Sequence, residues 1–149
     1  MAGNDAIIRK SDIEPRSDVE GHGGMRIYRF ARPGTNSRWL HLTLNEIEEG
    51  GGIEPHYHAG VEFDHAYYVL EGEVIARVGD HEERIGPDSL MLFPCQEVHG
   101  FRVVSPGGAR ILRLGASDTG VASGGNVYLT QSIDGTGDRE SGDVSHPGA

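Results

Sequence analysis

The feature that most constrains the fold is a series of short apolar runs, each ended after four to seven residues by turn-forming or charged residues. Within several runs apolar and polar side chains alternate, as in Val74, Ala76 and Val78 around Arg77. Alternation with a period of two predicts half-buried β-strands, and no window of eleven or more residues has a helical period. The runs are MRIYRF (25–30), WLHLTL (39–44), EPHYH (54–58), HAYYVL (65–70), EVIARV (73–78), SLMLF (89–93), HGFRVV (99–104) and ARILRL (109–114).

The connections between the runs predict one all-β domain of antiparallel strands, closed into a barrel or sandwich. The chain holds 23 Gly and 7 Pro in 149 residues, and many of them fall between the runs. Glu71-Gly72 and Gly79-Asp80 each separate two consecutive runs, and we expect both to be hairpin turns.

Three segments follow from this pattern. Residues 1–24 are expected to be an N-terminal arm, in which Ile7-Ile8 is the one apolar patch and a candidate strand. Residues 25–131 are expected to form the barrel, with a last strand at 126–130. Residues 132–149 have few apolar side chains to offset the entropy of ordering, so we expect a disordered, flexible tail.

Charge and composition exclude several classes of partner. The chain has 13 Lys and Arg against 23 Asp and Glu, a formal charge of -10, so nucleic acid and anionic membrane surfaces are not expected partners. It contains no apolar signal-peptide core, no apolar stretch long enough to span a membrane, and a lone Cys95 that cannot form an internal disulfide. These features predict a soluble, cytoplasmic protein.

Histidines supply the candidate functional site. Three of the eight, His56, His58 and His65, fall within ten residues, and His99 follows further along. Residues two apart in a strand project from the same face, so the rings of His56 and His58 are expected to lie roughly 6 to 7 Å apart along the strand. One metal ion can bind both, with further ligands from neighbouring strands.

Two segments resemble the sequence motifs of the cupin superfamily. Residues 50–72, GGGIEPHYHAGVEFDHAYYVLEG, resemble the first motif, and residues 87–99, PDSLMLFPCQEVH, resemble the second. The resemblance covers about residues 38–114. It implies a jelly-roll β-barrel of six or more strands with one divalent metal ion in its mouth, and it assigns His56, His58 and His99 as ligands.

The departures from the motifs concern the fourth ligand. Counted back from Gly72, the position of the family's Glu ligand falls on His65, whereas Glu62 stands at the usual distance from His58. We favour His65 because strand register fixes its distance to the turn, and Glu62 remains the alternative. In the second motif Pro87 and Gln96 replace glycines, which predicts an altered turn before His99.

An all-histidine site leaves the full +2 charge on the ion, which favours Lewis-acid chemistry over oxygen activation through a ferric state. Among small cupins, the resemblance associates such a site with aromatic polyketide cyclases. Zinc is the expected metal, with iron, manganese or nickel as alternatives. Tyr67, on the face of His65, and His41 are candidate proton-handling residues, but barrel packing for Tyr67 and a hydrogen-bonded, non-catalytic role for His41 are alternatives.

Two other functions stay open from the sequence. One is a cupin dioxygenase that uses Fe(II) on a diketone or phenolic compound, and the other is a non-enzymatic cupin whose metal fixes a bound small molecule. We also expect a homodimer, because Ile7-Ile8 could add a strand to a neighbouring sheet, as arms of this family do. Trp39, Met91, Phe93, Phe101 and Val103 are expected to line the barrel or pack on its sheet, and a pocket for an aromatic ligand is the alternative.

Overall fold

The computed structural model describes residues 6–58, 64–94, 96–116, 126–129 and 144–145, and it confirms the all-β prediction. None of the helices in these ranges is long and apolar enough to cross a membrane. The elements are η1 (Lys10–Asp12), β1 (His22–Ala31), β2 (Leu40–His58), β3 (His65–Glu71), β4 (Val74–Val78), β5 (His81–Ile85), β6 (Leu90–Phe93), β7 (His99–Val103), β8 (Ala109–Ala116), β9 (Asn126–Leu129) and β10 (Val144–Ser145).

The strand β2 connects the two halves of a single curled sheet. Its first part, Leu40 to Ile47, pairs with β8, and its last part, Gly52 to His58, pairs with β7 and β9. The strand β1 pairs with the first part and, at Gly52 and Ile53, with the start of the last part. The sequence predicted two separate strands here. They are continuous because glycines occupy the bend: Gly52 has φ 154°, and a Cβ on it would lie 2.0 Å from the carbonyl oxygen of Phe101.

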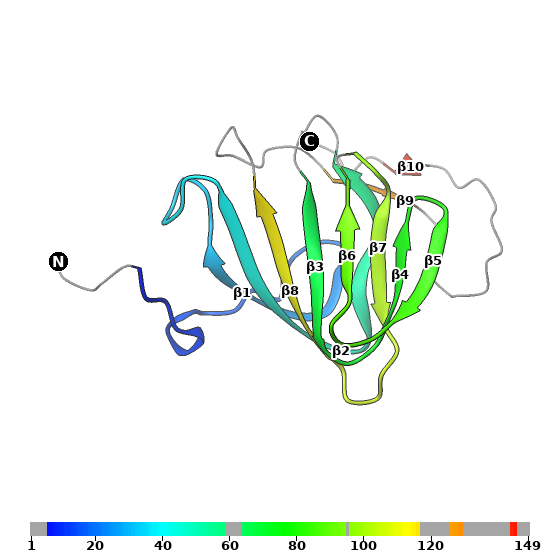
Figure 1. Cartoon of the computed structure of the whole chain (residues 1–149), viewed down its shortest axis with the longest axis horizontal. Coiled ribbons are helices and arrows are strands. Elements are labelled where there is room, and N and C mark those ends of the chain that lie inside the picture. The colour runs from blue at the N-terminus through cyan, green and yellow to red at the C-terminus, as the bar shows by residue number, and fades with distance from the viewer. Residues whose placement is uncertain (1–5, 59–63, 95, 117–125, 130–143, 146–149) are drawn as a thin grey trace.

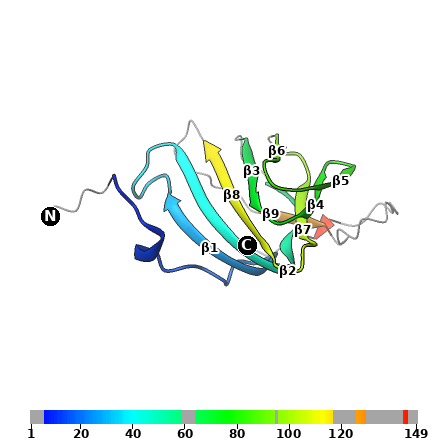
Figure 2. The same ribbon diagram turned by 60° about the horizontal axis from the view of Figure 1, so that its bottom comes forward.

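The described strands run antiparallel in the order β5-β4-β7-β2-β8-β3-β6. The strand β1 also pairs with β2, along the edge opposite to the one that pairs with β8. Figure 1 shows the sheet curling from β1 through β8 and β3 towards β4 and β5. In Figure 2, β1, β2 and β8 run side by side, while β4, β5 and β7 form a separate group. The curl brings β6 into contact with β4 and so encloses an interior.

The core fills this interior with inward-facing side chains from both halves. Opposed residues on neighbouring strands share a face, so the register defines rows, one of which joins Ile27, Asn45, Ile111 and Val69. The predicted lining residues Met91, Phe93, Phe101 and Val103 are confirmed as buried. The prediction for Trp39 is wrong, because its side chain is 43% exposed and lies beneath the guanidinium of Arg38.

One of the two predicted hairpins is confirmed. Gly79-Asp80 is a two-residue turn between β4 and β5, with Val78 opposite His81. Glu71-Gly72 is not a hairpin turn, because β3 pairs with β6 and β8 whereas β4 pairs with β5 and β7. The chain instead crosses from one half of the curled sheet to the other at Gly72, as in a jelly roll.

The N-terminal arm lies along β1 and contributes to it. Arg16 exchanges two backbone hydrogen bonds with Ile27, and β1 already begins at His22, inside the predicted arm. Ile7 and Ile8 form no strand and are exposed. Most of the predicted tail lies outside the described residues, and the part of the tail that is described is β10, which pairs with β9. Cys95 also lies outside the described residues.

Candidate metal centre

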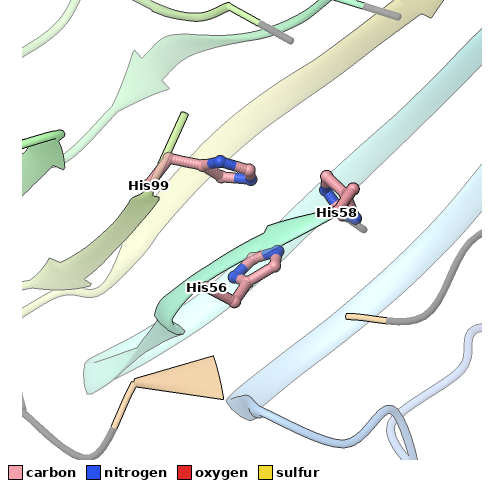
Figure 3. Close-up of side chains that lie close together, drawn as sticks. All are labelled: His56, His58 and His99. Carbon is pink, nitrogen blue, oxygen red and sulfur yellow. The ribbon is translucent and has the colours of Figure 1, made fainter. Parts of the chain in front are cut away.

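Three of the predicted ligands converge at one end of the curled sheet. His56 and His58 lie at the end of β2, and His56 is paired across the sheet with His99, the first residue of β7. Figure 3 shows the ring of His99 extending from β7 towards the rings of His56 and His58. One ring nitrogen from each of the three lies within 4.8 Å of the others, an arrangement that could hold a metal ion.

His65 joins this group from β3. Its side chain is 4% exposed, its Nε2 lies 3.0 Å from Nε2 of His99, and its ring centroid lies 5.1 Å from that of His58. The structure therefore places His65 against the three-histidine group, but the ring nitrogens that all lie within 4.8 Å of one another are those of His56, His58 and His99. Glu62, the alternative ligand, lies outside the described residues.

The hydrogen bonds of two histidines select the tautomer that a metal requires. Nδ1 of His56 donates to the carbonyl oxygen of Glu54 at 2.7 Å, and Nδ1 of His99 donates to that of Glu97 at 2.8 Å. Because a carbonyl only accepts, each Nδ1 carries the proton and, in the neutral ring, each Nε2 presents a lone pair.

These side chains fit a divalent ion. Two nitrogens bound at about 2.0 to 2.1 Å to one tetrahedral zinc ion lie about 3.3 to 3.4 Å apart. The Nε2 atoms of His65 and His99 form a hydrogen bond at 3.0 Å and are therefore slightly closer together than two zinc ligands. Burial is the main cause that lowers the pKa of His56 to about 3 and of His99 to about 2, and the pKa of His65 is lowered in the same way. The rings are therefore neutral at pH 7, as metal ligands must be.

The turn before His99 has the backbone conformation of a glycine although the residue is Gln96. Its φ is 62°, in the left-handed region, and the amide of Glu97 closes the turn by donating to the carbonyl of Pro94 at 3.1 Å. The amide of Gly79 then donates to the carbonyl of Val98 at 2.7 Å, which ties the segment before His99 to the β4–β5 hairpin.

The two candidate proton-handling residues occupy the inner face beside the histidines. The ring of Tyr67 lies 5.9 Å from that of His65 and is 3% exposed, between Phe93 and Phe101. His41 is half-buried and shares a cross-strand row with His65, through Gly115 on the strand between them. Tyr67 therefore lies beside His65, whereas His41 is separated from His65 by the strand β8.

Sequence reasoning missed two residues near the centre. His22, in the predicted arm, has its ring 6.3 Å from that of His56, and its Nδ1 donates to the carbonyl of Glu20 at 2.8 Å. The positive charge of Arg113 on β8 repels the protonated forms of His56, His65 and His99, and so helps to lower the pKa of each. The sequence could have indicated the position of Arg113. It stands two residues after the apolar Ile111 in an alternating strand, so both side chains belong to the inward face.

The comparison with protein families identifies a cupin domain over residues 43–114. This range lies within the 38–114 expected from the motifs. No curated protein matches the chain by sequence.

Several solved structures resemble the chain. The polyketide cyclase RemF from Streptomyces resistomycificus is 26% identical, with 74% of this chain and 77% of that chain covered and a TM-score of 0.61. TT1209 from Thermus thermophilus is 31% identical, with coverages of 60% and 82% and a TM-score of 0.50. A cupin-superfamily sugar phosphate isomerase from Silicibacter pomeroyi, 21% identical with coverages of 84% and 82% and a TM-score of 0.67, shares the fold.

Proposed function

Because the chain belongs to the cupin superfamily and resembles polyketide cyclases, we propose that it is a divalent-metal-dependent enzyme that acts on a small oxygenated substrate. The favoured reaction is the cyclisation of a poly-β-ketone by enolisation and aldol closure. The observation that carries this proposal is the convergence of His56, His58 and His99, whose ring nitrogens lie within 4.8 Å of one another. His65 adjoins this group through its contact with His99.

The donor set supports redox-neutral chemistry. The group that could hold a metal ion consists of three histidines, and imidazole binds a metal as a neutral ligand, so the ion would keep its +2 charge. A zinc ion bound there would act as a Lewis acid that polarises a substrate carbonyl and lowers the pKa of the adjacent CH₂. The hydrogen bonds from His56 and His99 to backbone carbonyls hold the rings in place for this role.

The inner face also offers groups to position the substrate and move a proton. Burial, together with the charges of Arg113, Arg32 and Arg29, lowers the pKa of His41 to about 4, so His41 is neutral at pH 7 and can accept a proton. The phenol of Tyr67 is a donor on the same face, in the neighbouring row. We assign His41 as the proposed base and Tyr67 as the group that orients the substrate oxygen.

The test separates cyclisation from oxygenation. Metal-free protein is reloaded with zinc or with ferrous iron and given a 1,3-diketone or a poly-β-ketone, in air and anaerobically, while product mass and dissolved oxygen are followed. We expect zinc to support a product formed without oxygen uptake. Activity that needs iron, consumes oxygen and adds oxygen atoms to the product would reject the cyclase proposal in favour of a dioxygenase.

Metal content tests the site itself. We expect about one divalent metal ion per chain by elemental analysis, and its loss in the variants His58→Ala and His65→Ala. His81→Ala is the matched control, because the His81 side chain is 74% exposed and lies on β5. Full metal content in His65→Ala together with loss in Glu62→Ala would replace the four-histidine site by three histidines and a glutamate.

A further inference from the structure

A row of inward-facing residues next to the metal centre contains two arginines. Residues opposite one another across β1, β2, β8, β3 and β6 share a face, and one such row, called here the arginine row, consists of Arg29, Thr43, Arg113, Tyr67 and Met91. Thr43, Tyr67 and Met91 are buried, which identifies this face as the inner one, and both arginines are half-buried.

The next row towards the metal centre is that of His41, Gly115, His65 and Phe93. Successive positions on one face of a strand are about 7 Å apart, so Arg113 is within a side chain's length of the space beside His65. Arg29 lies further from the four histidines, on the opposite side of Thr43 from Arg113, and its charge reaches His41. The charge of Arg113 reaches His41, His56, His65 and His99, and disfavours the protonated form of each.

Within the described part of the chain, no carboxylate forms an ion pair with Arg29, Arg32 or Arg113. Asp18 on the arm is the acid whose charge favours the charged form of Arg29, but its Oδ1 accepts a hydrogen bond from Nε of Arg16 at 3.1 Å. The neighbouring polar side chains Thr43 and Asn45 carry no charge. They form a hydrogen bond with each other, in which the hydroxyl of Thr43 donates to Oδ1 of Asn45 at 3.2 Å.

This concentration of positive charge is unexpected in a chain of net charge -10. Half-buried guanidinium groups without a carboxylate partner are costly, and their mutual repulsion adds to the cost. The charge lies beside a centre that would itself carry +2, with no acid from the described residues to offset it. An anionic group of a ligand would remove this imbalance, and the planar fork of an arginine matches a carboxylate.

We propose that Arg113 and Arg29 bind an ionised carboxylate of the substrate. This binding places the part of the substrate that carries its carbonyl groups beside the histidines. The proposal rests on the proposed function, since it names the substrate of the same site as a keto acid. Arg32, which is exposed, and the neutral His41 lie close to this carboxylate position. Arg113 and Arg29 are therefore specificity-determining residues, distinct from the histidines that hold the metal.

The experiment compares levulinate, a stable keto acid, with its neutral methyl ester and with inorganic phosphate, by calorimetric titration of the protein as purified. We expect levulinate to bind and the ester to bind at least about tenfold more weakly, since a hydrogen bond to a charged group is lost. Arg113→Gln and Arg29→Gln should remove this preference while the metal content stays at the wild-type value.

Two controls separate this result from the metal site. Arg110→Gln changes an arginine on the same strand that pairs with Glu71 at 2.9 Å, and it should keep the preference for levulinate. His58→Ala, expected to lack metal, should also keep the preference, whereas its loss there would mean that the metal binds the carboxylate. Equal binding of acid and ester, tighter binding of phosphate than of levulinate, or an unchanged preference in Arg113→Gln would overturn the proposal.

Discussion

At the scale of single residues, the protein keeps a group of imidazoles neutral in its interior. His56, His65 and His99 are each at most 4% exposed, and burial is the largest cause that lowers their pKa. The same burial that prepares them to bind a cation makes their protonation incompatible with the folded state. Acid should therefore affect stability and metal binding together.

The metal-free protein should lose stability as the pH falls. The pKa of a histidine is about 6.5 in the unfolded chain and about 3 for His56 and about 2 for His99 in the folded one. Below about pH 6.5 the unfolded chain takes up protons that the folded chain excludes. The stabilisation present above that pH is thus lost progressively towards pH 3, by up to about 1.4 kcal/mol per pH unit for each such histidine.

Urea unfolding in the presence of a chelator, at pH 7.5, 6.0 and 5.0, measures this dependence. His56→Gln should flatten the dependence of unfolding free energy on pH, because the substituted side chain does not titrate. His81→Gln should leave it unchanged, since His81 is exposed. A wild-type unfolding free energy that stays constant from pH 7.5 to 5.0 would show that these rings titrate normally in the folded protein.

The sequence predicted the histidines of the candidate metal site but not the charged and polar residues around them. His56 and His58 were found because a spacing of two in a strand fixes a common face, and the structure places both in one cluster with His99. His22 was not found, because its approach to His56 depends on how the arm joins β1. Arg29 and Arg113 become neighbours of Thr43 only through the register of three strands that are distant in sequence.

At the scale of elements, Gly72 fixes the crossing between the two halves of the sheet. It has φ 88°, and a Cβ added there would lie 2.3 Å from the carbonyl oxygen of Gly108 and 2.8 Å from Cα of Ala109. Both the backbone conformation and the backbone contact therefore exclude a side chain. Gly72 comes directly after β3, and His65 is the first residue of that strand. The position of His65 therefore depends on the crossing at Gly72.

Gly72→Ala should destabilise the fold more than a positive φ alone explains. The conformation costs about 1 to 2 kcal/mol for a non-glycine residue, and displacement of the Gly108 backbone adds to this. Gly34→Ala is the matched control, because Gly34 has φ 79° and nothing lies within 4 Å of its would-be Cβ. Urea unfolding should show a clearly larger loss for Gly72→Ala, and equal losses would mean that the backbone contact relaxes freely.

The strand prediction succeeded where local pattern decides and failed where connection geometry does. The runs from 65 to 114 correspond to β3, β4, β6, β7 and β8, because alternation reports a buried face. The Glu71-Gly72 connection was predicted as a hairpin because a short glycine turn looks the same in sequence whether the next strand pairs or crosses. Likewise, the bend at Gly52 was taken for a break between two strands.

At the scale of the whole molecule, the outer face of the sheet carries an apolar surface. Opposed residues across β2, β8, β3 and β6 place Leu42, Leu114, Ala66 and Leu92 in one outer row. Leu90 and Leu92 are 54% and 55% exposed, and Leu40 on the same face is 45% exposed. Contiguous apolar surface of this kind on a sheet marks an association site.

We propose that this face, called here the leucine face, is the interface of the expected homodimer. A two-fold axis buries the same patch on both subunits, so a face of leucines is complementary to itself without paired charges. The predicted arm strand is absent, since Ile7 and Ile8 form no strand, although both remain exposed. The leucine face is thus a better supported interface than the arm.

Leu92→Asp should convert the dimer to monomer, because a carboxylate facing its own copy would be desolvated and repelled. The substitution should leave folding intact, since the side chain is more than half exposed. Asp80→Lys, in the exposed β4–β5 hairpin, changes charge away from the leucine face and should not alter association. Light scattering at high micromolar concentration distinguishes the states. A monomeric wild-type protein would rule out the dimer, whereas a dimer that survives Leu92→Asp but not deletion of residues 1–20 would return the interface to the arm.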